Sequence, residues 1–333
     1  MSTQNKFGSS AESLDMSDRE LINLNKNRKW LNGHLPYLYW SSETYGQGSM
    51  YRKLLSFSTL QPLPFSSDHG VTTEPHLEES DWNSGAPIHF TYRSSAVQSR
   101  SRSSQRMQII NIEHPWITYR KQSRIEISKS ARGAIAFIPH SIATAPIQES
   151  LEEYLDLLVK KKSDFGHVTL CVAMKDVHAG IIPNLRKFNL PIVSVGHVNN
   201  RNFGLNFYRM ICNFRFGISN SFGSEVLIGT ELGLPFSIIG PLPKYMERYL
   251  STIGDHDPNG EPILNRKENY LKHYKRFLGP YEQIASSHFD SLRELCGVEI
   301  SPPVTEYRDL IISNFAHARI ELLKKIIRND AFN

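Results

Sequence analysis

Short apolar runs alternate with helical patterns through the second half of the chain. The runs lie at residues 107–112, 134–138, 168–173, 192–195, 216–219 and 236–239. Between them, apolar residues recur at helical spacing over 147–161, 180–188, 205–212 and 224–232. Short apolar strands that alternate with such helices are typical of a parallel sheet covered on both faces. The pattern therefore predicts the doubly wound α/β class.

The two ends of the chain follow other patterns. A capping box formed by Ser17 and Glu20 predicts a helix start near residue 17, but clear strands are few in the first 130 residues. After residue 265 the pattern is mostly helical. We therefore expect three parts: a smaller or degenerate α/β domain at 1–130, a Rossmann-like domain at 131–265, and a helical tail at 266–333 that packs back on the domains.

The composition is that of a globular protein large enough for two domains. Hydrophobic residues make up 40% and charged residues 21% of the 333 residues. No window reaches the roughly 18 uninterrupted apolar residues that a membrane span needs, and the first ten residues are polar, unlike a signal peptide. We therefore expect a cytoplasmic protein, with peripheral association to the inner membrane as an option.

The formal net charge of +5 suits anionic small molecules or an anionic membrane face. Nucleic-acid binding usually needs a concentrated basic stripe with interleaved aromatics, so we expect no nucleic-acid partner. One arginine series could meet an anionic acceptor glycan or a membrane, although charge runs are more often simply solvated. The series consists of Arg93, Arg100, Arg102 and Arg106.

The strongest local feature is the segment Ser219-Asn220-Ser221-Phe222-Gly223-Ser224-Glu225. It joins an apolar strand to a helix through small polar residues. A helix N-terminus presents unpaired N–H groups and a partial positive charge, and therefore binds anions such as phosphate. The alternative is an ordinary strand-to-helix turn in which Ser224 caps the helix.

Two further pairs of residues follow predicted strands. His140 and Ser141 come after the run at 134–138, and Gly196 and His197 come after the run at 192–195. The carboxyl ends of strands face the ligand crevice in this fold class, where a histidine can donate to a phosphate or ribose oxygen. A polar loop without a ligand explains Gly196 and His197 equally well.

A candidate for acid–base chemistry stands in Asp68-His69-Gly70. Either Asp68 or His69 could deprotonate an acceptor hydroxyl from a loop, although an ordinary turn explains the same residues. No compact set of His and Glu ligands is present, so we expect no metal and no cofactor. We also expect Cys171, Cys212 and Cys296 to be thiols, because they are odd in number and widely spaced.

These motifs, in this order, resemble those of bacterial GT-B glycosyltransferases that use CMP-activated sugars, namely sialyltransferases and the related Kdo-transferases. Asp68-His69-Gly70 is similar to their acidic-acidic-Gly motif, with His69 where the second acidic residue usually stands. Pro139-His140-Ser141 resembles their His-Pro motif, with the proline before the histidine. Ser219–Ser221 together with Ser224 resembles their serine-rich phosphate motif. The resemblance covers roughly half of the chain.

The resemblance implies a metal-independent transferase with a nucleotide-sugar donor as co-substrate. The acceptor would be a glycan or lipid-linked glycan in capsule, lipopolysaccharide or other surface polysaccharide synthesis, with the base in a cleft between the two halves and the helical tail available for a homodimer. The alternative is a non-catalytic subunit that binds nucleotide-sugar or glycan in a polysaccharide assembly complex. Dinucleotide, nucleophile-elbow and Walker motifs are absent from the sequence, which argues against other nucleotide-dependent enzymes and hydrolases.

Overall fold

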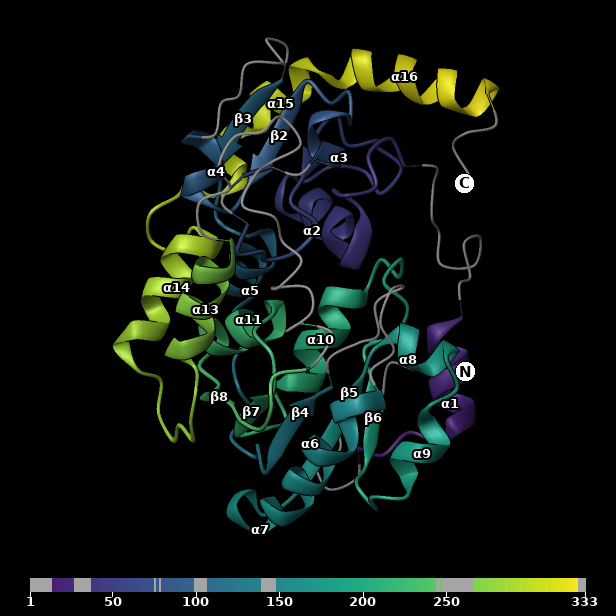
Figure 1. The fold of residues 1–333 in the computed structure, drawn as a ribbon. Helices are drawn as coiled ribbons and strands as arrows, with labels where there is room; N and C mark the ends of the chain where they lie inside the picture. The colour runs from purple at the N-terminus through teal and green to yellow at the C-terminus, as the bar shows by residue number, and fades with distance from the viewer. Residues whose placement is uncertain are drawn as a thin grey trace. The chain divides into compact units, whose positions relative to one another are not determined.

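The chain forms two compact units (Figure 1). The computed structural model describes residues 14–26, 37–74, 76–77, 79–98, 107–138, 148–243, 246 and 266–328. The five-stranded unit comprises Met1–Lys26, Ile125–His197 and Asn206–Phe289. The three-stranded unit comprises Asn27–Arg124, Val198–Leu205 and Asp290–Asn333.

These units differ from the predicted division at residues 130 and 265, because the chain passes between them several times. Helix α1 (Asp18–Asn25) belongs with the five-stranded sheet. The backbone N–H of Met16 donates to the carbonyl of Ile192 at 2.9 Å, and the carboxylate of Asp15 accepts from the Ile192 N–H at 2.8 Å. The capping box predicted at Ser17 and Glu20 is confirmed at the start of α1.

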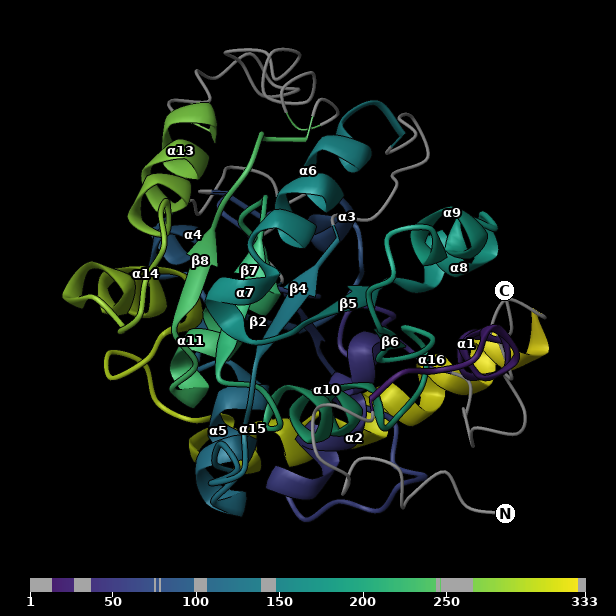
Figure 2. The ribbon, with the colours of Figure 1, turned by 90° about the horizontal axis from the view of Figure 1, so that it is seen from below.

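The five-stranded sheet is parallel throughout, in the order β6-β5-β4-β7-β8 (Figure 2). All five strands were predicted from the apolar runs, and the α/β class with a parallel sheet is confirmed. The strands are β4 (Ala134–Phe137), β5 (Val168–Val172), β6 (Ile192–Ser194), β7 (Phe216–Ser219) and β8 (Phe236–Ile238).

Alternate residues of the central strands face two different helical layers. Ala134 and Ala136 of β4 lie in one core cluster with residues of α1 and α6 (Gln148–Lys160). Phe137 points the other way, where its ring centroid lies 5.9 Å from that of Phe207 in α10 (Phe203–Ile211). Buried strands that are covered on both faces explain why the runs are continuously apolar rather than alternating.

Further helices complete the five-stranded unit, and the region after residue 265 is helical as predicted. Tyr270 and His273 of α13 pack on Phe222 in the turn after β7. These helices are α7 (Lys162–Phe165), α8 (Met174–His178), α9 (Ile182–Arg186), α11 (Ser224–Leu232), α13 (Arg266–Arg276) and α14 (Ser286–Cys296), which ends in the other unit.

The three-stranded unit has a smaller parallel sheet, in the order β1-β2-β3. Its strands are β1 (Ser66–Ser67), β2 (Ile88–Thr91) and β3 (Gln108–Asn111), of which the sequence predicted only the third. The rings of Phe65 and Phe90 meet edge to face at 4.9 Å in its core. The helical elements are η3 (Thr44–Gly46), α2 (Gln47–Leu54), α3 (Glu79–Trp82), α4 (Ser94–Gln98), α5 (Pro115–Ser123), η4 (Val304–Tyr307), α15 (Arg308–Ser313) and α16 (Phe315–Ile327).

Two further findings bear on the sequence predictions. Within the described residues, each helix is too short or too polar to cross a membrane. All three cysteines are thiols as predicted, with Cys171 and Cys296 buried and Cys212 partly buried.

Candidate functional site

The predicted phosphate turn lies at the topological switch point of the five-stranded sheet. From β4 the chain proceeds to β5 and then to β6 at one edge, returns to β7 on the other side of β4, and continues to β8. Ligands of open α/β sheets bind outside the carboxyl ends of the strands at such a reversal. Ser219 ends β7, which pairs directly with β4. The segment Ser219–Glu225 therefore stands where this fold class binds ligands.

Hydrogen bonds fix the backbone of this turn. The N–H of Ser221 donates to the Ser219 hydroxyl at 3.2 Å, and the side-chain amide of Asn220 donates to the carbonyl of Pro241 at 3.0 Å. The carbonyl oxygen Oδ1 of Asn220 is buried, and it has no hydrogen-bond partner among the described residues. A buried acceptor of this kind is suited to a hydroxyl or amine donor from a ligand.

Helix α11 begins without a side-chain cap. Its N-cap residue is Gly223, in an extended conformation with φ −153° and ψ −175°, and not Ser224 as the alternative interpretation of the sequence required. A methyl group on Gly223 would come within 2.4 Å of Oε2 of Glu225, so the glycine leaves room for that carboxyl group. The carboxyl group of Glu225 therefore lies at the N-terminus of α11.

Glu225 itself has an unusual protonation equilibrium. Burial raises the pKa of its carboxyl group to about 7, although hydrogen bonds from its own backbone N–H and from the Ser219 hydroxyl act in the opposite direction. Near neutral pH both the protonated and the ionised form of the group are therefore present. A protonated Glu225 can donate a hydrogen bond to a phosphate oxygen, whereas an ionised one would repel it.

The tail holds this turn from the other side. The N–H of Phe222 donates to the hydroxyl of Tyr270 at 3.1 Å, and the Phe222 ring stacks on that of His273 at 5.7 Å. Both partners belong to α13, so this helix fixes the position of the turn. No local pattern in the sequence indicates that role, because it depends on aromatic residues almost 50 positions later.

The structure describes only one of the two residue pairs that were predicted to follow other strands. His140 and Ser141 lie outside the described residues, so their role stays a prediction. Gly196 and His197 follow β6, the edge strand, which is two strands away from β4. At about 4.8 Å per strand, that places them roughly 10 Å to the side of β4. The fold does not bring them next to Ser219–Glu225.

Gly196 has a structural reason to be glycine. Its φ of +105° is unfavourable for other residues, and a Cβ atom there would lie 3.2 Å from the backbone carbonyl oxygen of Leu24 in α1. The neighbouring His197 is buried, with its ring 6.2 Å from that of His178. Close packing of α1 against this loop therefore accounts for Gly196 without a ligand.

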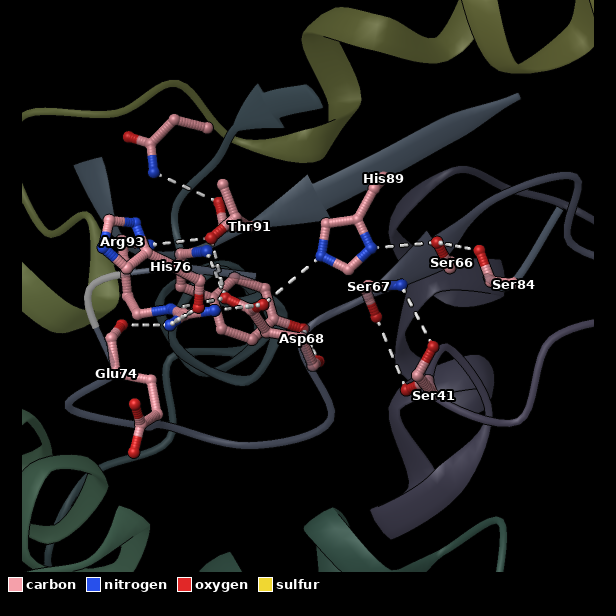
Figure 3. A network of polar contacts seen from close by, with 12 residues as sticks. Ser41, Ser66, Ser67, Asp68, Glu74, His76, Ser84, His89, Thr91 and Arg93 are labelled. Atoms are coloured by element: carbon pink, nitrogen blue, oxygen red, sulfur yellow. Dashed lines mark hydrogen bonds and ion pairs between the residues drawn. The ribbon is translucent and has the colours of Figure 1, made fainter. Parts of the chain in front are cut away.

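In the three-stranded unit, Asp68 follows β1 and is the centre of a buried polar cluster (Figure 3). Burial alone would raise the pKa of its carboxyl group, but the guanidinium of Arg93 and the nearby His89 hold that pKa well below its usual range. Its oxygens also accept from the Thr91 hydroxyl at 2.8 Å and the Tyr92 N–H at 3.0 Å. A carboxylate with these partners is a weak proton acceptor.

His69 is the more accessible member of the pair. Its side chain is partly exposed, and its ring centroid lies 5.4 Å from that of Trp40, whose side chain is exposed. The two residues therefore differ in their surroundings. The Asp68 carboxylate is buried and paired, whereas the His69 imidazole is partly exposed.

Arg93 corrects the expectation that its arginine series is solvated. The side chain is buried, because it bonds Asp68 through Nη2 at 2.9 Å and Nε at 3.2 Å. Its third nitrogen, Nη1, donates to the carbonyls of Glu74 and His76, the latter at 3.1 Å. Arg93 thus ties Asp68 to the segment that follows His69. Arg100, Arg102 and Arg106 lie outside the described residues.

Two further histidines of this unit are buried, and neither was among the predicted site residues. His89 lies in β2, with Nδ1 2.9 Å from the Ser66 hydroxyl and Nε2 3.3 Å from Asp68. Burial lowers the pKa of His114 to about 3, although Asp68 acts in the opposite direction, so this imidazole is neutral. The sequence signal that could have identified His89 and His114 is their position within, or just after, a strand.

Asp68, Asp81 and His89 form a group whose ligand atoms lie within 4.8 Å of one another, as in a metal site. Both ring nitrogens of His89 are already engaged, and both oxygens of Asp68 accept hydrogen bonds from Arg93 or its neighbours. A cation here would also face the Arg93 guanidinium at close range. The arrangement favours a buried ion pair over a metal centre.

Comparison with known proteins yields similar structures only. No protein family matches the sequence, and no curated protein matches it. Similar solved structures are the wall teichoic acid polymerase TagF (11% identity, TM-score 0.41, covering 77% of this chain and 69% of that one), the trehalose-6-phosphate synthase OtsA (11%, 0.32, 82% and 70%) and a UDP-forming α,α-trehalose-phosphate synthase from Burkholderia xenovorans (9%, 0.31, 83% and 72%).

These three proteins are glycosyltransferases of the GT-B type. TM-scores below 0.5 are compatible with different folds, so these similarities decide nothing about the function of this chain. A functional assignment therefore rests on the residues of the two units.

Proposed function

We propose that the chain is a glycosyltransferase that binds the phosphate of a nucleotide-activated sugar at Ser219–Glu225. One observation carries the proposal. A small polar turn and a helix N-terminus whose N-cap residue, Gly223, has no side chain stand together at the switch point of a parallel sheet. This combination supplies N–H donors and a partial positive charge at the position where the fold class binds nucleotides.

The turn would act mainly on the leaving group. When the sugar departs, negative charge develops on the nucleotide phosphate. The N–H groups at the start of α11 and the hydroxyls of Ser221 and Ser224 would stabilise that charge. Oδ1 of Asn220 would accept from a hydroxyl of the ribose or of the sugar, because it is the buried acceptor without a partner among the described residues. His140 and Ser141 would add contacts to the nucleotide.

The proposed general base is His69. A neutral imidazole can take the proton of an acceptor hydroxyl as that oxygen attacks the anomeric carbon. Asp68 would not take the proton, since it is ionised and paired with Arg93. It would instead fix the start of the segment that carries His69.

The finer assignment is a CMP-activated donor and a glycan or lipid-linked glycan acceptor of a surface polysaccharide such as capsule or lipopolysaccharide. The motif resemblance supports this choice. UDP is a competing nucleotide, because a phosphate site does not distinguish one nucleobase from another. A direct comparison of nucleotides therefore has to decide which nucleobase the donor carries.

The test is a thermal-shift comparison of CMP, CDP, UDP and GDP at millimolar concentration. We expect one of them to raise the melting temperature, and Ser221→Ala to reduce that rise. Ser163→Ala is the matched control, because Ser163 is exposed on α7 in the same unit. If none of the nucleotides raises the melting temperature of the wild-type chain, the proposed donor site is wrong.

An assay with the sugar-linked form of the same nucleotide then distinguishes an enzyme from a non-catalytic subunit. An enzyme releases free nucleotide from the matching nucleotide-sugar, at least slowly to water, and His69→Ala lowers the rate of release by a factor of about 10²–10⁴ while the thermal shift persists. A binding subunit shows the thermal shift in both proteins and releases no nucleotide in either.

A further inference from the structure

Helix α16 carries a row of apolar side chains on its outer face. Ala316, Ile320, Leu323 and Ile327 follow one another at intervals of four, three and four residues, which places them on one side of a helix. All four are exposed, and the exposed fractions of Ile320, Leu323 and Ile327 are 53%, 58% and 81%. We call these four residues the outer stripe.

The opposite side of α16 accounts for its attachment to the three-stranded unit. Ala318 is fully buried there, and Nζ of Lys325 donates to the carbonyl of Leu38 at 2.7 Å. Three large aliphatic side chains consequently remain on the side that faces away from the core. Leaving them in water has no benefit for folding, so the stripe calls for a separate explanation.

Basic residues flank the outer stripe on both sides. Arg319 lies along one border, and Lys324 and Arg328, four residues apart, lie along the other. The single acidic residue of α16 is Glu321, which accepts from Nζ of Lys324 at 2.7 Å. Such an exposed ion pair is weak, so Lys324 can exchange Glu321 for another anion.

The apolar surface extends beyond the helix. Leu60, which is 68% exposed, lines a shallow groove together with Leu323 and Arg319. Nη2 of Arg319 donates to the side-chain oxygen of Gln61 at 3.1 Å, which holds this loop beside α16. Apolar and basic groups from two segments therefore share one face of the three-stranded unit.

We propose that the outer stripe of α16 docks on an anionic lipid surface. A helix that lies in a membrane interface inserts its apolar side chains, while flanking Lys and Arg side chains reach the phosphate groups of the lipids. The outer stripe and its two basic borders have this arrangement. The proposal does not depend on the donor site, which lies in the other unit.

A second copy of the chain is a less suitable occupant. Two stripes could pair as in a coiled coil, because their spacing alternates between three and four residues. Both borders of the stripe are basic, however, so any such pairing would set like charges opposite one another. Lipid phosphates instead offer the opposite charge along both borders.

The experiment is co-sedimentation of the full chain with vesicles. One set contains phosphatidylcholine alone, and the other contains equal parts of phosphatidylcholine and phosphatidylglycerol. The variants are Leu323→Glu, which places a charge in the stripe, and the pair Lys324→Gln with Arg328→Gln. Ile300→Glu is the matched control, since Ile300 is 54% exposed in the same unit but lies outside α16.

We expect the wild-type chain and Ile300→Glu to sediment with the phosphatidylglycerol vesicles and not with phosphatidylcholine alone. Leu323→Glu and the Lys324/Arg328 variant should bind at least about tenfold more weakly. Their melting temperatures should stay unchanged, because these side chains are exposed. Wild-type protein that binds neither vesicle, or Leu323→Glu that binds as well as wild type, overturns the proposal. A dimer without vesicles that Leu323→Glu dissociates overturns it in favour of self-association.

Discussion

Arg93 and Asp68 form a buried ion pair in which Nη2 and Nε of the arginine donate to the two carboxylate oxygens at 2.9 and 3.2 Å. The remaining nitrogen of Arg93 donates to backbone carbonyls at Glu74 and His76. The pair therefore fixes both ends of the segment that contains His69. Its effects on stability and on activity can be measured separately.

Removing the arginine should destabilise the fold strongly. Arg93→Ala leaves the Asp68 carboxylate buried without its main partner, which costs about 3–5 kcal/mol in the free energy of unfolding. Urea unfolding measures this change, and Arg19→Ala, at an exposed position of α1, is the matched control. A loss below about 1 kcal/mol would show that the ion pair does not hold the fold.

Substitutions of His69 and Asp68 should affect the turnover number and the melting temperature differently. His69→Ala removes the proposed base and should lower the turnover number by a factor of about 10²–10⁴, with the melting temperature nearly unchanged. Asp68→Asn should lower the melting temperature first, because the buried arginine loses its counter-charge. Enzyme assays and thermal unfolding of both variants decide the matter. A stable Asp68→Asn protein with the same loss of turnover would make Asp68 the base.

The carboxyl group of Glu225 should make donor binding depend on pH. Its pKa is raised to about 7, so it is mostly neutral at pH 6 and mostly ionised at pH 8. An ionised Glu225 repels phosphate, and affinity for the nucleotide-sugar should therefore fall by up to about tenfold over this range. Calorimetric titration of wild type and Glu225→Gln tests this. The variant should bind with an affinity that does not change with pH, and the same decline in both proteins would refute the role of Glu225.

Gly196 should behave as a structural residue. Gly196→Ala places a side chain at a φ of +105° and against the backbone of Leu24, which should cost about 1–3 kcal/mol. Nucleotide binding should survive at a temperature where the variant is folded. A variant of wild-type stability that no longer binds nucleotide would return Gly196 to the donor site.

The sequence predicted the five-stranded sheet well for a physical reason. Its strands are buried on both faces, and they therefore read as unbroken apolar runs between helical patterns. In the smaller sheet, β1 has two residues and β2 contains His89, so neither gives such a run. The division into units was also hidden, because the pairing of residues 15 and 16 with Ile192 is a long-range contact.

The candidate site was predicted only where local pattern decides it. The polar turn at Ser219–Glu225 follows from a strand, a run of small residues and a helix, all adjacent in the sequence. The burial of Arg93 could not be predicted, because arginine is rarely buried without a charged partner. That partner, Asp68, is 25 residues away in the sequence. The protonation of Glu225 likewise depends on its surroundings in three dimensions.

The most direct measurement is a crystal structure of the chain with the nucleotide that stabilises it most. We expect a phosphate oxygen of this nucleotide to accept hydrogen bonds at the start of α11, from the N–H of Ser224 and the hydroxyls of Ser221 and Ser224. A phosphate bound elsewhere, for example at the end of β6 beside His197, would contradict this expectation.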